Sequence, residues 1–339
     1  MNLLLAVLAV AVVPMITFAA VPKKILDSDY ADLWKAWKSK YNKEYDTIAE
    51  EAKRFDIWVQ AKKEVSEHNI KHELGLSTYT QALNEFSDMS AEEFRSIYLG
   101  HKRMLRSEHY AAEPFPAQGS VPDTVDWVSA GYVTGVKNQA SCGSCWAFSA
   151  TGSVEGLFYN TTKNLQSFSE QQLVSCDSYC GGCGGGWAEA GITYFAKNGV
   201  YPESVYPYTS GNGYVAPCQS PGTPLTGVVS GYKSLPSGDE NSLKDASATI
   251  GPISIAIDAS QTSFQRYSGG VYYEPYCSTR SLDHAVLLVG YGTDSASNEA
   301  YWLVKNSWGT SWGMNGYIMM IRNYGNNCGV ATEASYAYL

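Results

Sequence analysis

The residues best suited to chemistry are one cysteine and one histidine in the C-terminal two thirds of the chain. Cys145 follows a short run that contains Gln139 and Cys142, and His284 is the only histidine after residue 120. A thiolate attacks carbonyl carbons, and an adjacent imidazole can accept and return the proton that such a reaction moves. Together they indicate nucleophilic acyl-transfer chemistry. Taken singly, each residue has a plainer interpretation, His284 as a structural histidine and Cys145 as half of a disulfide.

The elements around these two residues would position them well. Gly143 and Ser144 favour a turn, and the stretch from Cys145 to Phe158 is predicted to be a helix with small residues on one side. Cys145 would then lie in the first helical turn, where the helix dipole and free backbone N–H groups stabilise a thiolate. A neighbouring imidazolium would lower the pKa of the thiol further. His284 begins an apolar run that is typical of a buried strand.

The cysteine count leaves the role of Cys145 open. The chain has eight cysteines, so four disulfides can form, but if Cys145 stays free then one more cysteine must stay free as well. Cys176, Cys180 and Cys183 have the spacing of an iron–sulfur motif, although no repeating strand–helix units accompany them. A single histidine after residue 120 gives a zinc site little support. We expect neither a metal nor a cofactor.

Composition excludes several classes of protein. The chain has 339 residues, a formal net charge of −9 and a pI near 5.1. Aromatic residues make up 13% of it, which argues against a largely disordered protein. The acidic balance argues against a nucleic-acid-binding protein, which usually carries a basic face.

Residues 1–19 have the features of a secretory signal peptide. An apolar run from Leu3 to Val13 is followed by small residues at positions 17 and 19, where a signal peptidase would read them. The run is too short to span a bilayer, and no later stretch reaches the roughly 18 to 20 apolar residues that a membrane helix needs. We therefore expect entry into the secretory pathway and no membrane span.

The composition changes again near residue 120. Residues 20–120 contain 32 charged residues, whereas residues 121–339 contain only 25 in twice the length together with all eight cysteines. Between them lies a stretch rich in small residues and proline, which indicates a linker. The sequence therefore predicts a prosegment at 20–120 and a mature domain at 121–339.

The predicted prosegment is mainly helical. Leu33, Trp34 and Trp37 fall on one helical stripe, and the stretch Glu50–Asn69 contains no glycine or proline and is predicted to be one long helix. The residues at 84–88 indicate a short extended piece. Ser90 and Glu93 then have the spacing of a capping box at the start of another helix.

These motifs, taken together, resemble the papain family of cysteine proteases, and its cathepsin L branch most of all. The resemblance rests on Gln139, on the run from Cys142 to Trp146, on Asp283-His284-Ala285 and on the run from Lys305 to Gly309. It extends into the prosegment, where an inhibitory-propeptide pattern is matched by Glu50, Arg54, Trp58, Val65 and Asn69 and by Asn84, Phe86 and Asp88. Ala61 and Ala82 depart from that pattern, replacing an asparagine and a glycine.

The resemblance implies a role for each motif residue. Cys145 would be the nucleophile, His284 its proton-transfer partner and Asn306 the residue that orients the imidazole, with Trp308 shielding that bond. Gln139 would join the backbone N–H of Cys145 in an oxyanion hole. The second substrate subsite would be formed by Gly185, Gly186, Trp187, Ala188, Ala256, Asp283, Ala285 and Glu333. Most of these are small or apolar and suit a hydrophobic substrate side chain.

Glu333 would add a second kind of substrate to that subsite, because a carboxylate at the pocket floor could pair with arginine. The alternative interpretation is an exposed glutamate at the rim. The resemblance also implies the disulfides Cys142–Cys183, Cys176–Cys218 and Cys277–Cys328, with Cys180 as an extra thiol that could replace Cys183 as the partner of Cys142. Asn160 begins the only N-x-S/T sequon and is a candidate glycosylation site.

The implied fold is α+β with two lobes, a helical one from Cys145 to about Gly231 and a β-barrel-like one, with the active site at their seam. Strands of the second lobe are predicted at Pro252–Asp258, His284–Tyr291, Tyr301–Asn306 and Tyr317–Arg322.

The implied function is that of a monomeric, secreted or lysosomal cysteine endopeptidase made as a self-inhibited zymogen. Its partners would be protein or peptide substrates, its own propeptide and cystatin-like inhibitors, and it would act in a lysosome, a related acidic vacuole or outside the cell. The alternative is a catalytically silent binding or inhibitor protein on the same scaffold. Such a protein would usually lack the nucleophile, which is present here.

Overall fold

The computed structural model describes residues 23–102, 115–116 and 119–339, so the predicted signal peptide lies outside the described residues. The chain divides into two compact units, one ending at Glu51 and the other beginning at Ala52. The first unit contains helix α1 (Lys23–Tyr41) and the start of helix α2 (Ile48–Glu73).

In α1 the rings of Trp34 and Trp37 stack with their centroids 5.1 Å apart, and both side chains are buried. Leu33 is 47% exposed, so the predicted stripe is wrong at that position. The ring of Trp37 also packs on Tyr41, one turn further along the helix, with centroids 5.5 Å apart. The buried face is therefore centred on positions 34, 37 and 41, and residue 33 falls outside it.

The second unit begins with the rest of the predicted prosegment. The predicted long helix is confirmed as α2, and strand β1 (Tyr79–Gln81) runs back beside it. Asn69 joins the two, since its side-chain amide exchanges two hydrogen bonds of 2.9 Å with the backbone of Gln81. Helix α3 (Ala91–Tyr98) begins with the predicted capping box between Ser90 and Glu93.

The segment predicted to be extended, Asn84–Asp88, is instead a tight turn. The side-chain oxygen of Asn84 accepts the N–H of Phe86 at 3.1 Å, and its amide nitrogen donates to the carbonyl of Gln265 at 2.7 Å. Asparagine readily closes turns in this way, through a bond between side chain and backbone. Hydrophobic periodicity does not register such a bond, so the prediction failed here.

The helical lobe contains the predicted helix that begins at Cys145. The small residues of this helix face the sheet, because a Cβ atom built on Gly152 would lie 2.7 Å from Leu287 and one built on Gly156 would lie 2.8 Å from Pro252. Glycine at these positions allows the helix to pack tightly against the other lobe. The elements of this lobe are α4 (Cys145–Thr162), α5 (Glu170–Cys176), α6 (Ala188–Asn198) and the 3₁₀ turns η1 (Gly182–Gly184) and η2 (Ser210–Asn212).

The other lobe is built on a sheet with the order β1-β5-β8-β7-β6-β4-β9-β3, in which β2 also pairs with β6. All pairs are antiparallel except β5 with β8. Its elements are β2 (Val125–Asp126), β3 (Gly231–Ser234), α7 (Glu240–Thr249), β4 (Ile253–Ile257), α8 (Thr262–Gln265), β5 (Tyr267–Tyr272), β6 (His284–Thr293), β7 (Ala300–Lys305), β8 (Tyr317–Ile321), η3 (Asn327–Gly329) and β9 (Glu333–Tyr338).

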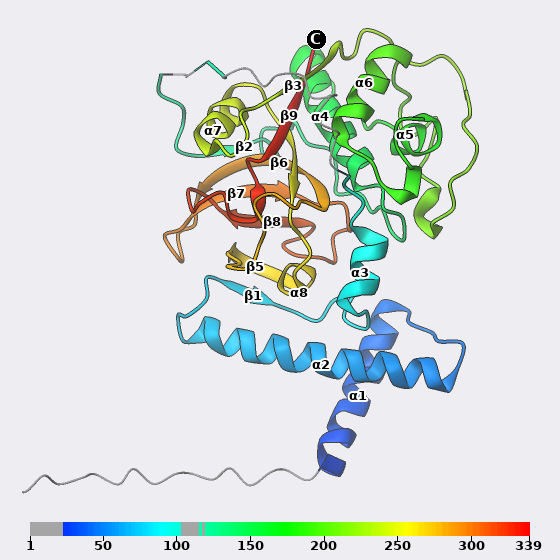
Figure 1. Cartoon of the computed structure of the whole chain (residues 1–339), viewed down its shortest axis with the longest axis vertical. Coiled ribbons are helices and arrows are strands. Elements are labelled where there is room, and N and C mark those ends of the chain that lie inside the picture. Colours follow the sequence, from blue (N-terminus) through cyan, green and yellow to red (C-terminus); the bar gives the residue numbers. More distant parts are fainter. Residues whose placement is uncertain (1–22, 103–114, 117–118) are drawn as a thin grey trace, which may run out of the picture. The chain divides into compact units, whose positions relative to one another are not determined.

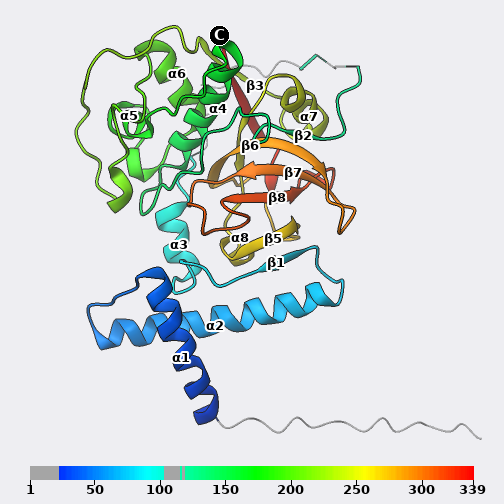
Figure 2. The same cartoon turned by 180° about the vertical axis from the view of Figure 1, so that it is seen from behind.

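All four predicted strands are present, with boundaries that differ by at most two residues. The sheet is open, because its end strands β1 and β3 do not pair with each other. Figures 1 and 2 show the strands β5 to β8 on one side of the second unit and the helices α4 to α6 on the other. The predicted α+β arrangement in two lobes is confirmed, and α4 lies where they meet.

Candidate active site

Cys145 is the first residue of α4 and is fully buried. Its sulfur accepts the backbone N–H of Ala285 at 3.5 Å. Because Ala285 directly follows His284, the start of α4 and the start of β6 bring the two predicted chemical residues to the same point of the seam. The location of the sulfur at a helix N-terminus is the one that favours a thiolate once solvent can reach it.

The imidazole of His284 is held from two sides. Its Nε2 atom lies 2.8 Å from Oδ1 of Asn306, and the indole of Trp308 stacks on the ring with centroids 4.6 Å apart. The same Oδ1 accepts the N–H of Ser307 at 2.8 Å, which identifies that atom as the amide oxygen. His284 must therefore donate through Nε2, which leaves Nδ1 to exchange a proton with a reacting group.

Neither of the two chemical residues is charged in this arrangement. Burial raises the pKa of Cys145 to about 11, although the N–H groups of Ala285 and Gly100 act in the opposite direction. Burial also lowers the pKa of His284 to about 4, although the bond to Asn306 acts in the opposite direction. A thiolate–imidazolium pair is unfavourable while the site is covered, so the structure describes an inactive state.

The cover is the predicted prosegment, which continues from α3 across the site. Gln139 donates through its side-chain amide to the carbonyl of Tyr98 at 2.9 Å. The backbone of Gly186 donates to the carbonyl of Gly100 at 2.9 Å and accepts the N–H of Lys102 at 2.8 Å. The residues expected to bind a substrate backbone thus bind the backbone of the prosegment.

One prosegment side chain enters the predicted second subsite. Nε2 of His101 lies 3.0 Å from Oε2 of Glu333, and His101 is only 8% exposed. Its backbone N–H donates to the carbonyl of Asp283 at 3.0 Å. Glu333 lies opposite Ala256 in the sheet, and Ala256 lies opposite Ala285. Four predicted subsite residues are therefore brought together here.

The other predicted subsite residues do not all lie in the same place. A Cβ atom on Gly185 would lie 2.5 Å from the carbonyl of Gly100, so glycine leaves room there for a chain in the cleft. Gly186 is buried beside it, and Ala188 is buried at the start of α6. Trp187 is half-buried and lines a separate cavity of about 410 Å³ beside Tyr194.

The cysteines form the three pairs that the resemblance implies, Cys142–Cys183, Cys176–Cys218 and Cys277–Cys328. Cys145 and Cys180 are free. Burial, with the nearby Asp177 carboxylate, raises the pKa of the Cys180 thiol, so this second thiol is a weak nucleophile. Asn160 is exposed near the end of α4.

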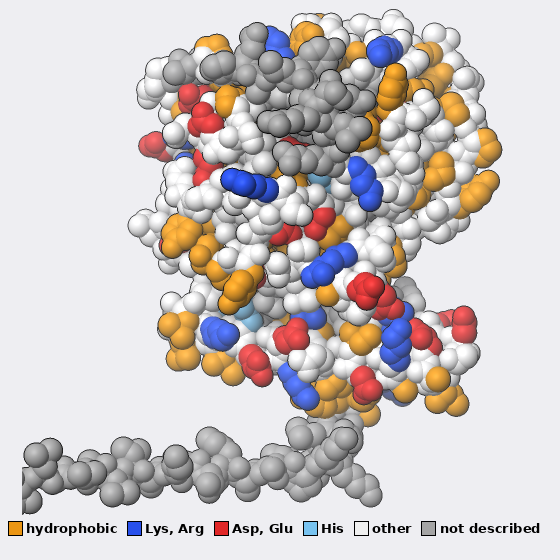
Figure 3. Space-filling view, in the orientation of Figure 1, with side chains coloured by type: hydrophobic (Ala, Val, Ile, Leu, Met, Phe, Trp, Pro, Cys, Tyr) orange, Lys and Arg blue, Asp and Glu red, His pale blue; other side chains and the backbone are white. Residues whose placement is uncertain are grey.

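The residues that the structure describes include no helix long and apolar enough to cross a membrane. They also include no group of three His, Cys, Asp or Glu side chains arranged to hold a metal ion. Figure 3 shows acidic and basic side chains interspersed over the visible face, with no large basic patch.

Sequence reasoning missed the prosegment residues that occupy the site. Gly100 and His101 follow helix α3 and have no periodic pattern around them, and His101 was only one of four histidines before residue 120. Tyr98 ends α3 and binds Gln139 through its backbone carbonyl, which a pattern of side chains does not report. Their role depends on partners between 41 and 232 positions away in the chain. No local signal in the sequence would have found them.

Comparisons with known families agree with this arrangement. The family model described as papain family cysteine protease matches residues 121–338. The model described as cathepsin propeptide inhibitor domain (I29) matches residues 34–94. The two matches fall on the cysteine-containing part and on the helical prosegment respectively.

Individual relatives cover nearly the whole chain. Digestive cysteine proteinase 1 of Homarus americanus is 46% identical over 89% of this chain and 93% of its own length. Cathepsin K of Mus musculus is 41% identical over 95% of this chain and 96% of its own. Digestive procathepsin L 3 from the larval midgut of Tenebrio molitor has a similar structure, with a TM-score of 0.83, 41% identity, and coverage of 91% of this chain and 99% of its own.

Proposed function

Because the chain belongs to the papain family of cysteine proteases, we propose that Cys145 is its nucleophile, His284 its general acid and base, and Asn306 the residue that orients His284. The protein is a cathepsin L-like cysteine endopeptidase made as a zymogen with its own inhibitory propeptide. The observation that carries the assignment is the 2.8 Å bond between His284 and Asn306 beside the sulfur of Cys145.

The reaction follows from these positions. The thiolate of Cys145 attacks the carbonyl carbon of a peptide bond, and the carbonyl electrons move onto its oxygen. The oxyanion then collapses, the C–N bond breaks, and the leaving amine takes a proton from the His284 imidazolium. This leaves a thioester, which a water molecule attacks after giving its proton to His284. The thioester bond breaks, the carboxylic acid leaves, and the thiolate–imidazolium pair is restored.

Gln139 would stabilise the oxyanion. Its side-chain Nε2 is fully buried and already donates to two carbonyls, those of Tyr98 and Cys142, each at 2.9 Å. A substrate oxygen would replace the carbonyl of Tyr98 once the prosegment is removed. The second donor would be the backbone N–H of Cys145, which is free of intrahelical partners at the first position of α4.

Covalent labelling tests the assignment of Cys145. A peptidyl epoxide should alkylate Cys145 slowly in the intact zymogen at about pH 6, because burial raises the pKa of that thiol to about 11. The labelling rate of the zymogen should rise as the pH approaches 11. After prosegment removal the same reagent should label Cys145 rapidly at about pH 6.

Cys180, the other free cysteine, is the matched control for this experiment. Peptide mapping by mass spectrometry locates the label. A label on Cys180, or no label on the processed protein, would overturn the assignment and would favour a catalytically silent protein. Equal labelling rates in zymogen and processed protein would contradict the covering role of the prosegment.

We also propose that the second subsite accepts both hydrophobic and basic side chains. The apolar side is formed by Ala256 and Ala285, and the carboxylate of Glu333 is held 3.0 Å from the His101 imidazole. A substrate arginine would replace His101 there and would pair with both carboxylate oxygens.

Substitution of Glu333 tests this specificity. In the variant Glu333→Gln, kcat/KM for an Arg-Arg substrate should fall by about tenfold or more, whereas that for a Phe-Arg substrate should stay within about twofold. Glu189→Gln is a suitable control, because this carboxylate lines the neighbouring cavity beside Trp187. Equal losses on the two substrates, or the same loss in Glu189→Gln, would defeat the proposal.

The three disulfides and the digestive and cathepsin relatives place the protein in the secretory pathway or outside the cell. Within that range we propose delivery by a signal peptide at 1–19 to a lysosome or related acidic vacuole, or export. We further propose a boundary between propeptide and mature enzyme at 120/121, a glycan on the exposed Asn160, a monomeric state and inhibition by cystatin-like proteins. Peptide sequencing of the protein isolated from its cell would test the two cleavage sites and the glycan together.

A further inference from the structure

A tyrosine outside the proposed catalytic set connects both ends of the segment that leads to the nucleophile. The hydroxyl of Tyr208 lies 2.9 Å from the carbonyl of Gln139 and 2.8 Å from the hydroxyl of Ser144. A carbonyl only accepts hydrogen bonds, so the single phenol proton points to Gln139 and Ser144 must donate to the phenol oxygen. One side chain thus holds residue 139 and the residue directly before Cys145.

The segment between these two contacts is held in an unfavourable conformation. Ala140 has φ of 49°, in the left-handed region that costs a non-glycine residue about 1 kcal/mol or more. Such a conformation persists only where neighbouring contacts fix it. Gln139 and Ser144 are both fully buried, so a carbonyl of Gln139 left without Tyr208 would lose its partner away from water.

Gln139 is held from the opposite side by Ser307. Its backbone N–H donates to the carbonyl of Ser307 at 2.8 Å, and its side-chain oxygen accepts the Ser307 hydroxyl at 2.7 Å. These bonds fix Gln139 to the sheet lobe, whereas Tyr208 fixes it to the helical lobe. The bonds to Ser307 and to Tyr208 together therefore set the direction in which the side-chain amide of Gln139 points.

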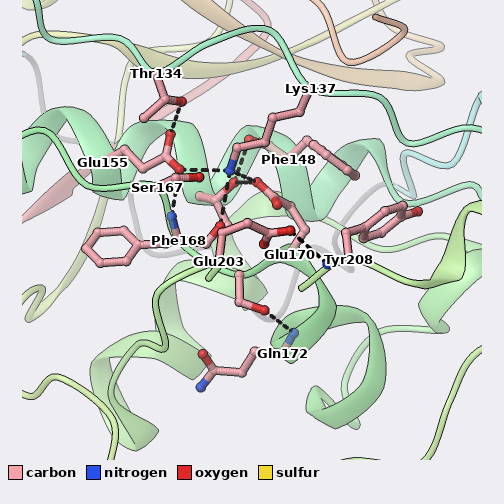
Figure 4. Close-up of polar contacts among 12 residues, drawn as sticks. Thr134, Lys137, Phe148, Glu155, Ser167, Phe168, Glu170, Gln172, Glu203 and Tyr208 are labelled. Carbon is pink, nitrogen blue, oxygen red and sulfur yellow. Dashed lines mark hydrogen bonds and ion pairs between the residues drawn. The ribbon is translucent and has the colours of Figure 1, made fainter. Parts of the chain in front are cut away.

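Tyr208 is itself anchored next to a buried cluster of charges. Its backbone N–H donates to Oε1 of Glu203 at 2.7 Å, and its ring packs on Phe148 of α4 with centroids 5.1 Å apart. Figure 4 shows Glu203 beside Glu170, which with Glu155 surrounds the ammonium group of Lys137 at 2.6 and 2.9 Å.

Two pKa shifts accompany this anchoring. Burial, and then the negative charge of Glu170, raise the pKa of Glu203 to about 7. Burial raises the pKa of Tyr208 above its usual value, so the phenol keeps the proton that it donates to Gln139.

We propose that Tyr208 is a positioning residue for the oxyanion hole: by bonding Gln139 and Ser144 at once, it fixes the distance between the Gln139 amide and the Cys145 backbone N–H. The inference rests on the proposed function of Gln139 as an oxyanion donor. Tyr208 bonds through its hydroxyl to the carbonyl of Gln139 and the hydroxyl of Ser144. It acts through the geometry of the two donors, and small misplacements of catalytic groups are costly.

The variant Tyr208→Phe removes the hydroxyl and keeps the ring on Phe148. We expect kcat of the processed enzyme to fall about tenfold with KM within about twofold, because the contacts that bind substrate in the ground state are unchanged. Tyr201→Phe is the matched control, since the Tyr201 hydroxyl also donates to a backbone carbonyl at 2.9 Å, that of Gly222, away from the site. Ser144→Ala removes the second bond of Tyr208 and should lower kcat in the same direction.

A double-mutant cycle with Gln139→Ala separates positioning from a general structural effect. If Tyr208 acts through Gln139, adding Tyr208→Phe to Gln139→Ala should lower kcat by less than about twofold. Additive losses in the double variant, or an unchanged kcat in Tyr208→Phe, would overturn this inference alone. A normal kcat in Gln139→Ala would defeat the proposed oxyanion donor, and the inference with it. Equal losses in Tyr208→Phe and Tyr201→Phe would reduce Tyr208 to a structural residue.

Discussion

Changing Cys145 to alanine should abolish peptide-bond hydrolysis, with kcat/KM falling by about 10⁴-fold or more. The sulfur is the only group of the site able to form the thioester, and the remaining donors can stabilise an oxyanion but cannot create one. The chain should then accumulate as the full-length zymogen if processing is carried out by the enzyme itself. To measure the loss, an added protease first cleaves the prosegment, and the hydrolysis of a fluorogenic peptide by the processed protein is then followed.

Cys180→Ala is the matched control, because both residues are free cysteines of the same lobe and differ mainly in position. Its activity should stay within about twofold of the parent, since burial raises the pKa of Cys180 and keeps it protonated. Substantial hydrolysis by Cys145→Ala would contradict the proposed mechanism. A comparable loss in Cys180→Ala would indicate that removal of either thiol disturbs folding.

Replacing Gly100 by alanine should release the inhibition by the prosegment. A Cβ atom on Gly100 would lie 1.8 Å from the carbonyl oxygen of Gly143 and 2.4 Å from its carbonyl carbon. Both are backbone atoms of the segment before Cys145, so neither can move aside as a flexible side chain would. The prosegment must lift from the cleft instead, which also breaks the bonds of Gln139 to Tyr98 and of Glu333 to His101.

Overpacking of this kind costs about 1–3 kcal/mol, which corresponds to labelling of Cys145 in the intact zymogen about 5 to 150 times faster than in the parent. Early time points analysed by intact mass distinguish labelled zymogen from processed enzyme. Gly119→Ala is the control, because a Cβ atom there would have nothing within 4 Å. The processed enzyme should be unchanged in both variants, since the proposed mature domain excludes the two positions. Equal labelling in both zymogens would contradict the role given to Gly100.

Local signals in the sequence accounted for much of the fold. The capping box at Ser90, the helix from Cys145 and the apolar strand from His284 were all predicted, because each depends on residues within a few positions of one another. The predictions failed at Leu33, where the buried face is rotated, and at Asn84, where a side-chain bond closes a turn. Neither effect appears in a pattern of apolar residues.

The site was predicted in part for the same reason. Cys145, His284, Asn306 and Gln139 carry recognisable motifs, and the structure brings them to one seam. No such motif marks His101 or Tyr208, because their roles come from partners on other elements. His101 contacts Glu333, and Tyr208 contacts Gln139 and Ser144. Contacts of this kind are fixed by the tertiary fold and leave no spacing that a single sequence would reveal.

The pairing of β1 with β5 has a consequence for the enzyme after maturation. Strand β1 belongs to the prosegment, and Tyr79 and Thr80 cover Gly270 and Gly269 of β5. When the prosegment is removed, β5 becomes an edge strand whose unpaired peptide groups face water. Such an edge can pair with an extended polypeptide of another molecule. Gly269 and Gly270 have no side chains that could pack against a pairing strand. This limits self-association of the mature enzyme through the edge that removal of β1 exposes.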